Sequence, residues 1–73
     1  MSEETKALPP IARNMKALRA KMDISQDRLA KFADISFHTI TKIETGDTPN
    51  PTVDTMKRIA DALGVTIDDL IKE

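Results

Sequence analysis

The chain has 73 residues and a formal net charge of −1, which fits one small domain and gives no overall basic excess for binding nucleic acid. It contains no cysteine, which excludes disulfide bridges and thiolate metal sites and makes a reducing cytoplasm the expected location. No apolar stretch approaches the roughly 20 residues that span a bilayer, and residues 1–5 lack the basic and apolar regions of a signal peptide, so we expect no membrane association.

Pro9 and Pro10 mark the start of the first predicted helix, because proline is tolerated at a first helical position. Apolar residues then recur on a 3.6-residue period, so this helix is expected to run to about Met22. Its apolar stripe consists of Ile11, Met15, Leu18 and Met22. We expect Met15, Met22 and, further along the chain, Met56 to fill the core.

Two short helices come next. Ser25 is a favourable N-cap with Asp27 in the turn that follows, which predicts a second helix over about Gln26–Ala33. Ser36 offers another N-cap, and Gly46 supplies the left-handed residue that ends a helix, so the third helix is expected over about 36–45. The inward residues of this pair are Leu29, Ala30, Ala33, Ile40 and Ile43.

Two further helices complete the predicted fold. The fourth is expected to begin at about Thr52 and to end at Leu63, before Gly64. Its apolar stripe consists of Val53, Met56, Ile59, Ala60 and Leu63. Thr66 and Asp69 have the spacing of a capping box, which predicts a short last helix. The apolar face of that helix consists of Ile67, Leu70 and Ile71.

The tight connection Asp34-Ile35 between two short helices is typical of a helix-turn-helix. Several stretches agree in order and spacing with one family, namely Ile24 to Ala30, Ala33 to Ser36, Thr39 to Gly46, Pro51 to Met56 and Ile59 to Val65. Over about Ile11–Ile71 the chain resembles the lambda-repressor-like family, also called the Cro or xenobiotic-response-element type. The resemblance implies an all-α, compact five-helix DNA-binding domain over 7–73, with the helix-turn-helix in helices 2 and 3, after a flexible N-terminus over 1–6.

Two residues depart from the family pattern. Asp34 stands where the family usually has glycine in the turn, although aspartate tolerates the left-handed region better than most residues. Asp47 stands where a basic residue is common, which weakens the phosphate contact expected just after the third helix. The charges are also uneven, because residues 6–42 carry eight Lys or Arg against three Asp, whereas residues 43–73 carry three against seven Asp or Glu. This uneven distribution of charge fits two interpretations equally well, namely a basic face that contacts phosphate and an ordinary solvated surface.

The resemblance implies that outward residues at the start of the third helix read base edges in the major groove. These residues are Phe37, His38, Thr39 and Lys42. Lys42 can donate to guanine or to a phosphate, His38 can donate or accept, and Phe37 can pack on a thymine methyl group. The structural alternatives are that Phe37 packs as peripheral core and that His38 is an ordinary surface residue. As the only histidine, His38 gives no metal site, and no nucleophile is arranged beside it, so we expect no enzyme and no cofactor.

The resemblance also implies phosphate contacts and one structural ion pair. Gln26 and Ser36, at the starts of helices 2 and 3, are expected to contact phosphate, and Asn50 and Thr52 are weaker candidates at the entry to helix 4. The alternative for Gln26 and Ser36 is a local capping role. Arg19 and Glu44 are expected to form a salt bridge between helix 1 and the end of helix 3.

The functional hypothesis is a sequence-specific regulator of transcription, of repressor or controller type, that binds double-stranded DNA. One short helix reads only about four or five base pairs, so we expect a homodimer on a near-palindrome, with a dimer interface that includes Ile67, Leu70 and Ile71. A phage repressor, a restriction-modification controller and an antitoxin with a toxin partner all fit these features, and no small-molecule effector is indicated. The alternative from another class is a protein-interaction module that kept the fold and lost DNA binding.

Overall fold

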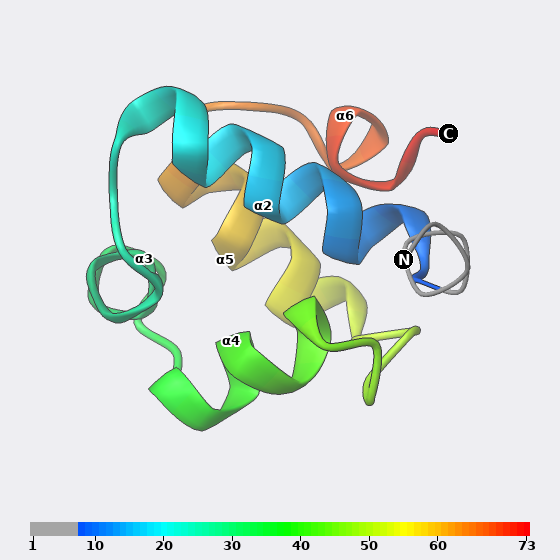
Figure 1. The fold of residues 1–73 in the computed structure, drawn as a ribbon, viewed down its shortest axis with the longest axis horizontal. Coiled ribbons are helices and arrows are strands. Elements are labelled where there is room, and N and C mark those ends of the chain that lie inside the picture. The colour runs from blue at the N-terminus through cyan, green and yellow to red at the C-terminus, as the bar shows by residue number, and fades with distance from the viewer. Residues whose placement is uncertain (1–7) are drawn as a thin grey trace.

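The computed structural model describes residues 8–73, and helices are the only regular elements in this range. The helices are α2 (Pro10–Met22), α3 (Gln26–Ala33), α4 (Phe37–Glu44), α5 (Val53–Leu63) and α6 (Ile67–Ile71), as Figure 1 shows. The all-α prediction with these five helices is confirmed. The flexible N-terminus expected over 1–6 lies outside the described residues.

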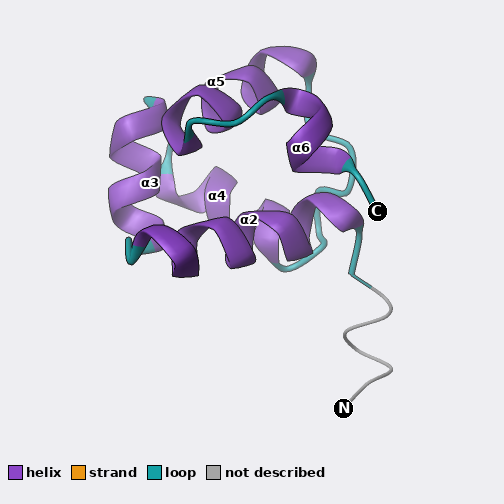
Figure 2. Ribbon diagram, turned by 90° about the horizontal axis from the view of Figure 1, so that it is seen from above, coloured by secondary structure: helices purple, strands orange, loops and turns teal. Residues whose placement is uncertain are grey.

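The helices enclose one core. α2 packs against α4 and α6, whereas α5 packs against α3 and α6; α3 is seen end-on in Figure 1. Figure 2 shows α6 beside the start of α2, where it covers the end of the core furthest from α3. Fully buried side chains come from every helix, namely Met15, Leu29, Ile40, Ile43, Ile59 and Leu70. The short helix-turn-helix is therefore held rigidly against a continuous apolar body.

Two apolar residues expected in the core are instead exposed. Met22 is 41% exposed and Val53 is 68% exposed, so the prediction that both stripes are buried along their whole length was wrong at these positions. Met22 is the last residue of α2 and Val53 is the first of α5. Both residues thus lie at helix ends, whereas Met15 in the middle of α2 is fully buried.

Four helices begin with the hydroxyl caps that the sequence predicts. The side-chain oxygens of Ser25, Ser36, Thr52 and Thr66 each accept a hydrogen bond from the backbone N–H three residues later, at 3.0 to 3.1 Å. At α6 the capping box is complete, because the Asp69 carboxylate also accepts from the backbone N–H of Thr66 at 3.3 Å. These bonds satisfy donors that the first turn of a helix leaves without partners, and so fix where each helix begins.

The capping box makes stability sensitive to acid. Hydrogen bonds from the backbone and then the side chain of Thr66 hold the pKa of Asp69 below its usual range. A lowered folded-state pKa contributes stability above the unfolded pKa, and this contribution is lost as pH falls through the folded value. We expect Asp69→Asn to lose less stability than the wild type over this acid range, measured by urea unfolding at several pH values. Asp68→Asn is the matched control, and an equal acid response in all three proteins would contradict the prediction.

Left-handed residues end three of the helices. Asp23 and Asp34, with φ of 57° and 59°, follow α2 and α3, and Gly64, with φ of 72°, follows α5. Gly46, with φ of 90°, lies two residues after α4, where the left-handed residue was expected. The tolerance of Asp34 for this conformation, expected from the sequence, is thus used in the turn between α3 and α4.

Asp23 is a position at which glycine is expected to raise stability. The left-handed region costs an L-residue roughly 1 to 2 kcal/mol, and somewhat less for aspartate. Glycine avoids this cost, but its greater freedom in the unfolded chain offsets part of the gain in stability. We expect Asp23→Gly to raise the free energy of unfolding by up to about 1 kcal/mol. Thermal unfolding would show this as a higher Tm, and Asp23→Ala should lower it. A lower Tm for the glycine variant would contradict the assignment.

Candidate nucleic-acid interface

The helix-turn-helix consists of α3 and α4, joined through Asp34, Ile35 and Ser36. On α4 the inward side chains Ile40 and Ile43 are fully buried. The opposite side of this helix is therefore presented to solvent in a fixed position. Such a helix can enter a groove without rearranging the core.

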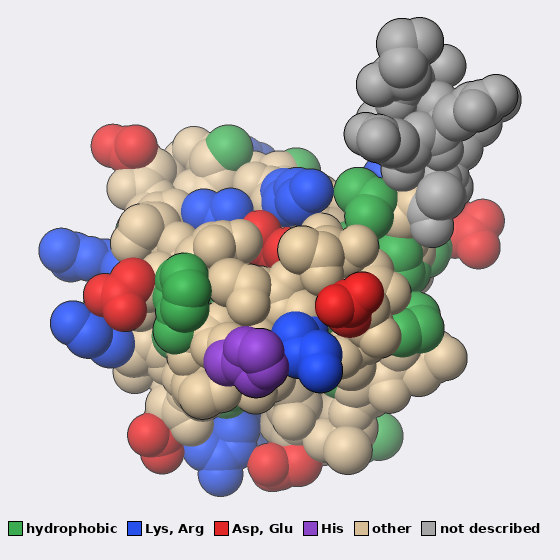
Figure 3. Space-filling view, turned by 60° about the horizontal axis from the view of Figure 1, so that its bottom comes forward, with side chains coloured by type: hydrophobic (Ala, Val, Ile, Leu, Met, Phe, Trp, Pro, Cys, Tyr) green, Lys and Arg blue, Asp and Glu red, His purple; other side chains and the backbone are tan. Residues whose placement is uncertain are grey.

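The outward side of α4 carries most of the residues that the sequence assigns to base contacts. His38 and Lys42 are exposed, and Phe37 is 50% exposed, so its ring is neither core nor fully solvated. Figure 3 shows this face, with the histidine near its centre, a basic side chain beside it, and acidic side chains around it. The face is mixed in charge rather than uniformly basic.

Thr39 differs from its neighbours because its side chain is engaged within the helix start. Its hydroxyl lies 2.8 Å from the Ser36 hydroxyl, and its backbone N–H donates to the same oxygen at 3.1 Å. Thr39 is half-buried, whereas Ser36 is exposed. Ser36 thus caps α4 while remaining accessible from outside.

The other candidates for phosphate contact lie at the starts of α3 and α5. Gln26 is half-buried, and its Nε2 donates to Glu44 Oε1 at 2.9 Å, a bond that sequence patterns did not indicate. Thr52 caps α5 and donates to the Thr55 hydroxyl at 3.0 Å. Asn50 is exposed in the preceding loop. These candidates thus belong to two chain segments, the start of α3 and the entry to α5.

Arg19 and Glu44 form a paired contact between α2 and the end of α4. Arg19 Nε donates to Glu44 Oε2 at 2.7 Å and Nη2 donates to Oε1 at 2.9 Å. The Glu44 side chain is 1% exposed and that of Arg19 is 19% exposed. The hydrogen bond to Glu44 raises the pKa of Arg19 above its ordinary value, against the opposing effect of burial. The two-bond geometry fixes the angle between α2 and α4.

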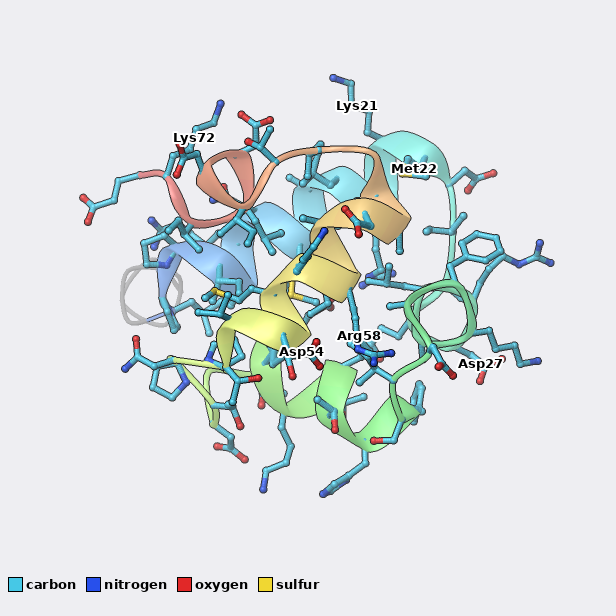
Figure 4. All side chains as sticks on the ribbon, turned by 180° about the vertical axis from the view of Figure 1, so that it is seen from behind. Lys21, Met22, Asp27, Asp54, Arg58 and Lys72 are labelled. Carbon is cyan, nitrogen blue, oxygen red and sulfur yellow. The ribbon has the colours of Figure 1, made fainter. Side chains whose placement is uncertain are left out.

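A second contact, absent from the sequence analysis, joins α5 to the turn of the helix-turn-helix. Arg58 Nε donates to Asp54 Oδ2 at 3.0 Å, and Nη1 lies 3.4 Å from Asp34 Oδ2. Figure 4 shows Arg58 beside Asp54, in the region between α5 and α3. The spacing of four residues between Asp54 and Arg58 is visible in the sequence. The contact with Asp34, 24 residues away, has no local signal.

The three residues expected at a dimer interface differ in how far they are exposed. Leu70 is fully buried within the monomer, Ile67 is half-buried, and Ile71 is 42% exposed. The end of α6 is tied to α2 by Asn14, whose Nδ2 donates to the carbonyls of Leu70 and Lys72, both at 2.8 Å. Any apolar surface that α6 offers to a partner is therefore made by Ile71 and the edge of Ile67, not by Leu70.

A shallow apolar groove of about 240 Å³ lies beside the end of α6. Four prolines dominate its wall, and its lining residues are Pro9, Pro10, Ile11, Pro49, Asn50, Pro51, Met56 and Ile71. The groove connects the exposed surface of Ile71 with the loop that precedes α5.

Comparison with known proteins identifies a family. A model of the helix-turn-helix family matches residues 15–70, which is well over half of the chain and includes α3 and α4 entirely. No curated protein and no solved structure matches the chain. Within the part of the chain that the structure describes, no helix is long and apolar enough to cross a membrane.

Proposed function

Because this chain belongs to the lambda-repressor-like helix-turn-helix family, of the Cro and xenobiotic-response-element type, it is a DNA-binding regulator of transcription, and we propose that α4 reads a specific operator. The observation that carries this proposal is the division of α4 into a buried side and an exposed side. The family is a regulatory rather than a catalytic one, which supports a function in binding.

The exposed side of α4 provides a chemically varied surface for base edges. Lys42 donates to guanine O6 and N7, His38 donates or accepts at a base edge, and Phe37 packs on a thymine methyl group. The Thr39 hydroxyl is hydrogen-bonded to the Ser36 hydroxyl and contributes to base contacts at the start of the helix. This surface favours a site that contains both T and G.

Phosphate contacts around α4 fix its position in the groove. Ser36 and Gln26 contact the backbone from the starts of α4 and α3, and Asn50 and Thr52 contact it from the loop before α5 and its first turn. The exposure of Ser36, Asn50 and Thr52 supports these roles. Asp47, exposed shortly after α4, limits the phosphate contacts that this loop can make.

The active species we propose is a homodimer of repressor or controller type. Two recognition helices about 34 Å apart read two half-sites of a near-palindrome, which supplies the specificity that one short helix lacks. The exposed part of α6, together with the adjoining apolar groove, supports the placement of the twofold contact at Ile71 and Ile67.

A charge at position 71 is expected to weaken the dimer. We predict that Ile71→Lys lowers self-association and the apparent affinity for a symmetric site, because it places a charge in an apolar contact. Sedimentation velocity at several concentrations measures the effect. The matched control is Met22→Lys, which is similarly exposed, at 41% against 42%, and lies well apart from the C-terminal end in Figure 4. Equal behaviour of the two variants would place the dimer contact elsewhere.

The DNA-binding surface is tested by an NMR titration of the ¹⁵N-labelled chain with a mixed-sequence duplex at low salt. We expect the shift changes to concentrate on α4 and on the first turns of α3 and α5, with α6 little affected. Shift changes centred on any other surface, or none up to high micromolar duplex, would contradict the proposal.

A further inference from the structure

The carboxylate of Glu44 joins three helices through its two oxygens. Oε2 accepts from Arg19 Nε at 2.7 Å, and Oε1 accepts both from Arg19 Nη2 and from Gln26 Nε2 at 2.9 Å. Glu44 is the last residue of α4, Gln26 the first of α3, and Arg19 belongs to α2. The bond from Gln26 Nε2 to Oε1 is thus additional to the ion pair, and it connects the buried carboxylate with the start of α3.

This bond sets which way the Gln26 amide faces. An ionised carboxylate only accepts hydrogen bonds, so the amide nitrogen, and not the amide oxygen, must lie against it. A flipped amide would bring two oxygens together at a half-buried site, at a large cost. The carboxylate is held in place, because Arg19 donates two hydrogen bonds to it and a third, at 3.0 Å, to the Ile24 carbonyl.

The consequence is a surplus of donors at the start of α3. The Gln26 amide nitrogen has two protons and uses one on Glu44, which leaves the other for an outside acceptor. Among residues 8–73, no group accepts from the backbone N–H groups of Gln26 and Asp27, because the Ser25 hydroxyl accepts from Arg28. A phosphate oxygen, which only accepts, matches these donors.

We propose that Glu44 is a positioning residue for DNA binding, which acts by holding the Gln26 amide with a nitrogen proton available to a backbone phosphate. This inference rests on the proposed function of α3 and α4. It gives the buried carboxylate a role in binding that is separate from its pairing with Arg19, and it identifies the chemistry of the contact as a donor from Gln26 to a phosphate oxygen.

The restraint of the Gln26 amide is tested on the free protein by side-chain amide NMR. Gln26 is the only glutamine, and the only asparagines, Asn14 and Asn50, serve as internal references. Asn14 is held by two carbonyls, whereas Asn50 is exposed in a loop. The order parameter of the Gln26 amide is expected to match that of Asn14 and to exceed that of Asn50. A Gln26 amide as mobile as that of Asn50 overturns the proposal, even if no variant folds.

The role in binding is tested by a double-mutant cycle on one duplex at fixed salt, with Glu44→Gln, Gln26→Ala and the double variant. Glu44→Gln keeps the shape but can donate, so the Gln26 amide is free to flip. We expect it to weaken binding by roughly three- to tenfold, the equivalent of about one hydrogen bond, with no added loss in the Gln26→Ala background. An equal loss in both backgrounds means that Glu44 acts only through folding, which overturns the proposal. A wild type that binds no duplex refutes the proposed function instead, while the amide order parameter still decides whether Glu44 holds the Gln26 amide in place.

Discussion

Replacing Glu44 with alanine is expected to lower the free energy of unfolding by about 3 to 5 kcal/mol. The carboxylate is 1% exposed, and its removal leaves the largely buried Arg19 without the partner that both of its bonds to α4 require. A domain of 73 residues is expected to have only about 4 to 11 kcal/mol in total. The variant should therefore lose a large share of its stability, and urea denaturation at 25 °C would measure the loss.

The matched control for Glu44→Ala is an exposed ion pair of the same fold. Asp61 pairs with Lys57 at 3.3 Å, but both side chains are about two-thirds exposed, at 68% and 67%. Asp61→Ala should change the free energy of unfolding by less than about 0.5 kcal/mol. If Glu44→Ala cost no more than this control, or if a double-mutant cycle gave no coupling between Arg19 and Glu44, the structural role assigned to the pair would be wrong.

Replacing Lys42 with alanine is expected to weaken operator binding by about 1 to 3 kcal/mol, or roughly five- to 150-fold. The side chain is exposed on the outward side of α4 and forms no ion pair among the described residues, so its charge is free for DNA. If it contacts a guanine, the variant should also lose preference for G at one position of each half-site. Fluorescence anisotropy on a set of single-base variants of the operator measures both effects.

Lys21→Ala is the control for Lys42→Ala because it removes the same charge from a different surface. Figure 4 shows Lys21 on the far side of the molecule from α4. We expect this control to bind almost as the wild type does at physiological salt. If Lys42→Ala lowered the affinity equally for all sequences, Lys42 would be a phosphate contact. If the affinity did not change, Lys42 would lie outside the interface.

The sequence predicted the limits of the helices because these are decided by local chemistry. Ser25 and Ser36 hydroxyls cap α3 and α4 through the backbone N–H three residues later, an arrangement that requires no tertiary contact. The left-handed Asp34 likewise follows from the length of the connection and the tolerance of aspartate. The all-α fold and its family were predicted from these signals together with the order of the motifs.

Contacts between distant residues were predicted only where the resemblance to a family suggested them. Arg19 and Glu44 were paired on that ground alone, and they do lie in contact. The bond from Gln26 to Glu44 and the contact of Arg58 with Asp34 join residues 18 and 24 positions apart, and depend on how α3 and α5 pack. No periodicity or spacing signals such a bond before the packing is known.

Apolar periodicity predicted which faces turn inward but not how far each stripe is covered. Met22 and Val53 continue their stripes to the ends of α2 and α5, where both are exposed. On α6 the stripe includes Leu70, which the monomer buries, and Ile71, which it leaves partly open. Periodicity alone does not distinguish residues that pack within the monomer from residues available to a partner.

Selection of binding sites from a random double-stranded DNA pool, at about physiological salt, tests the central claim most directly. Non-specific binding weakens strongly at that salt concentration while specific contacts survive. We predict enrichment of a two-fold symmetric motif whose half-site centres lie about one helical turn, or 34 Å, apart. Failure to enrich any motif would contradict a sequence-reading function and favour a protein-interaction module, for which the net charge of −1 and the exposed Asp47 are suited.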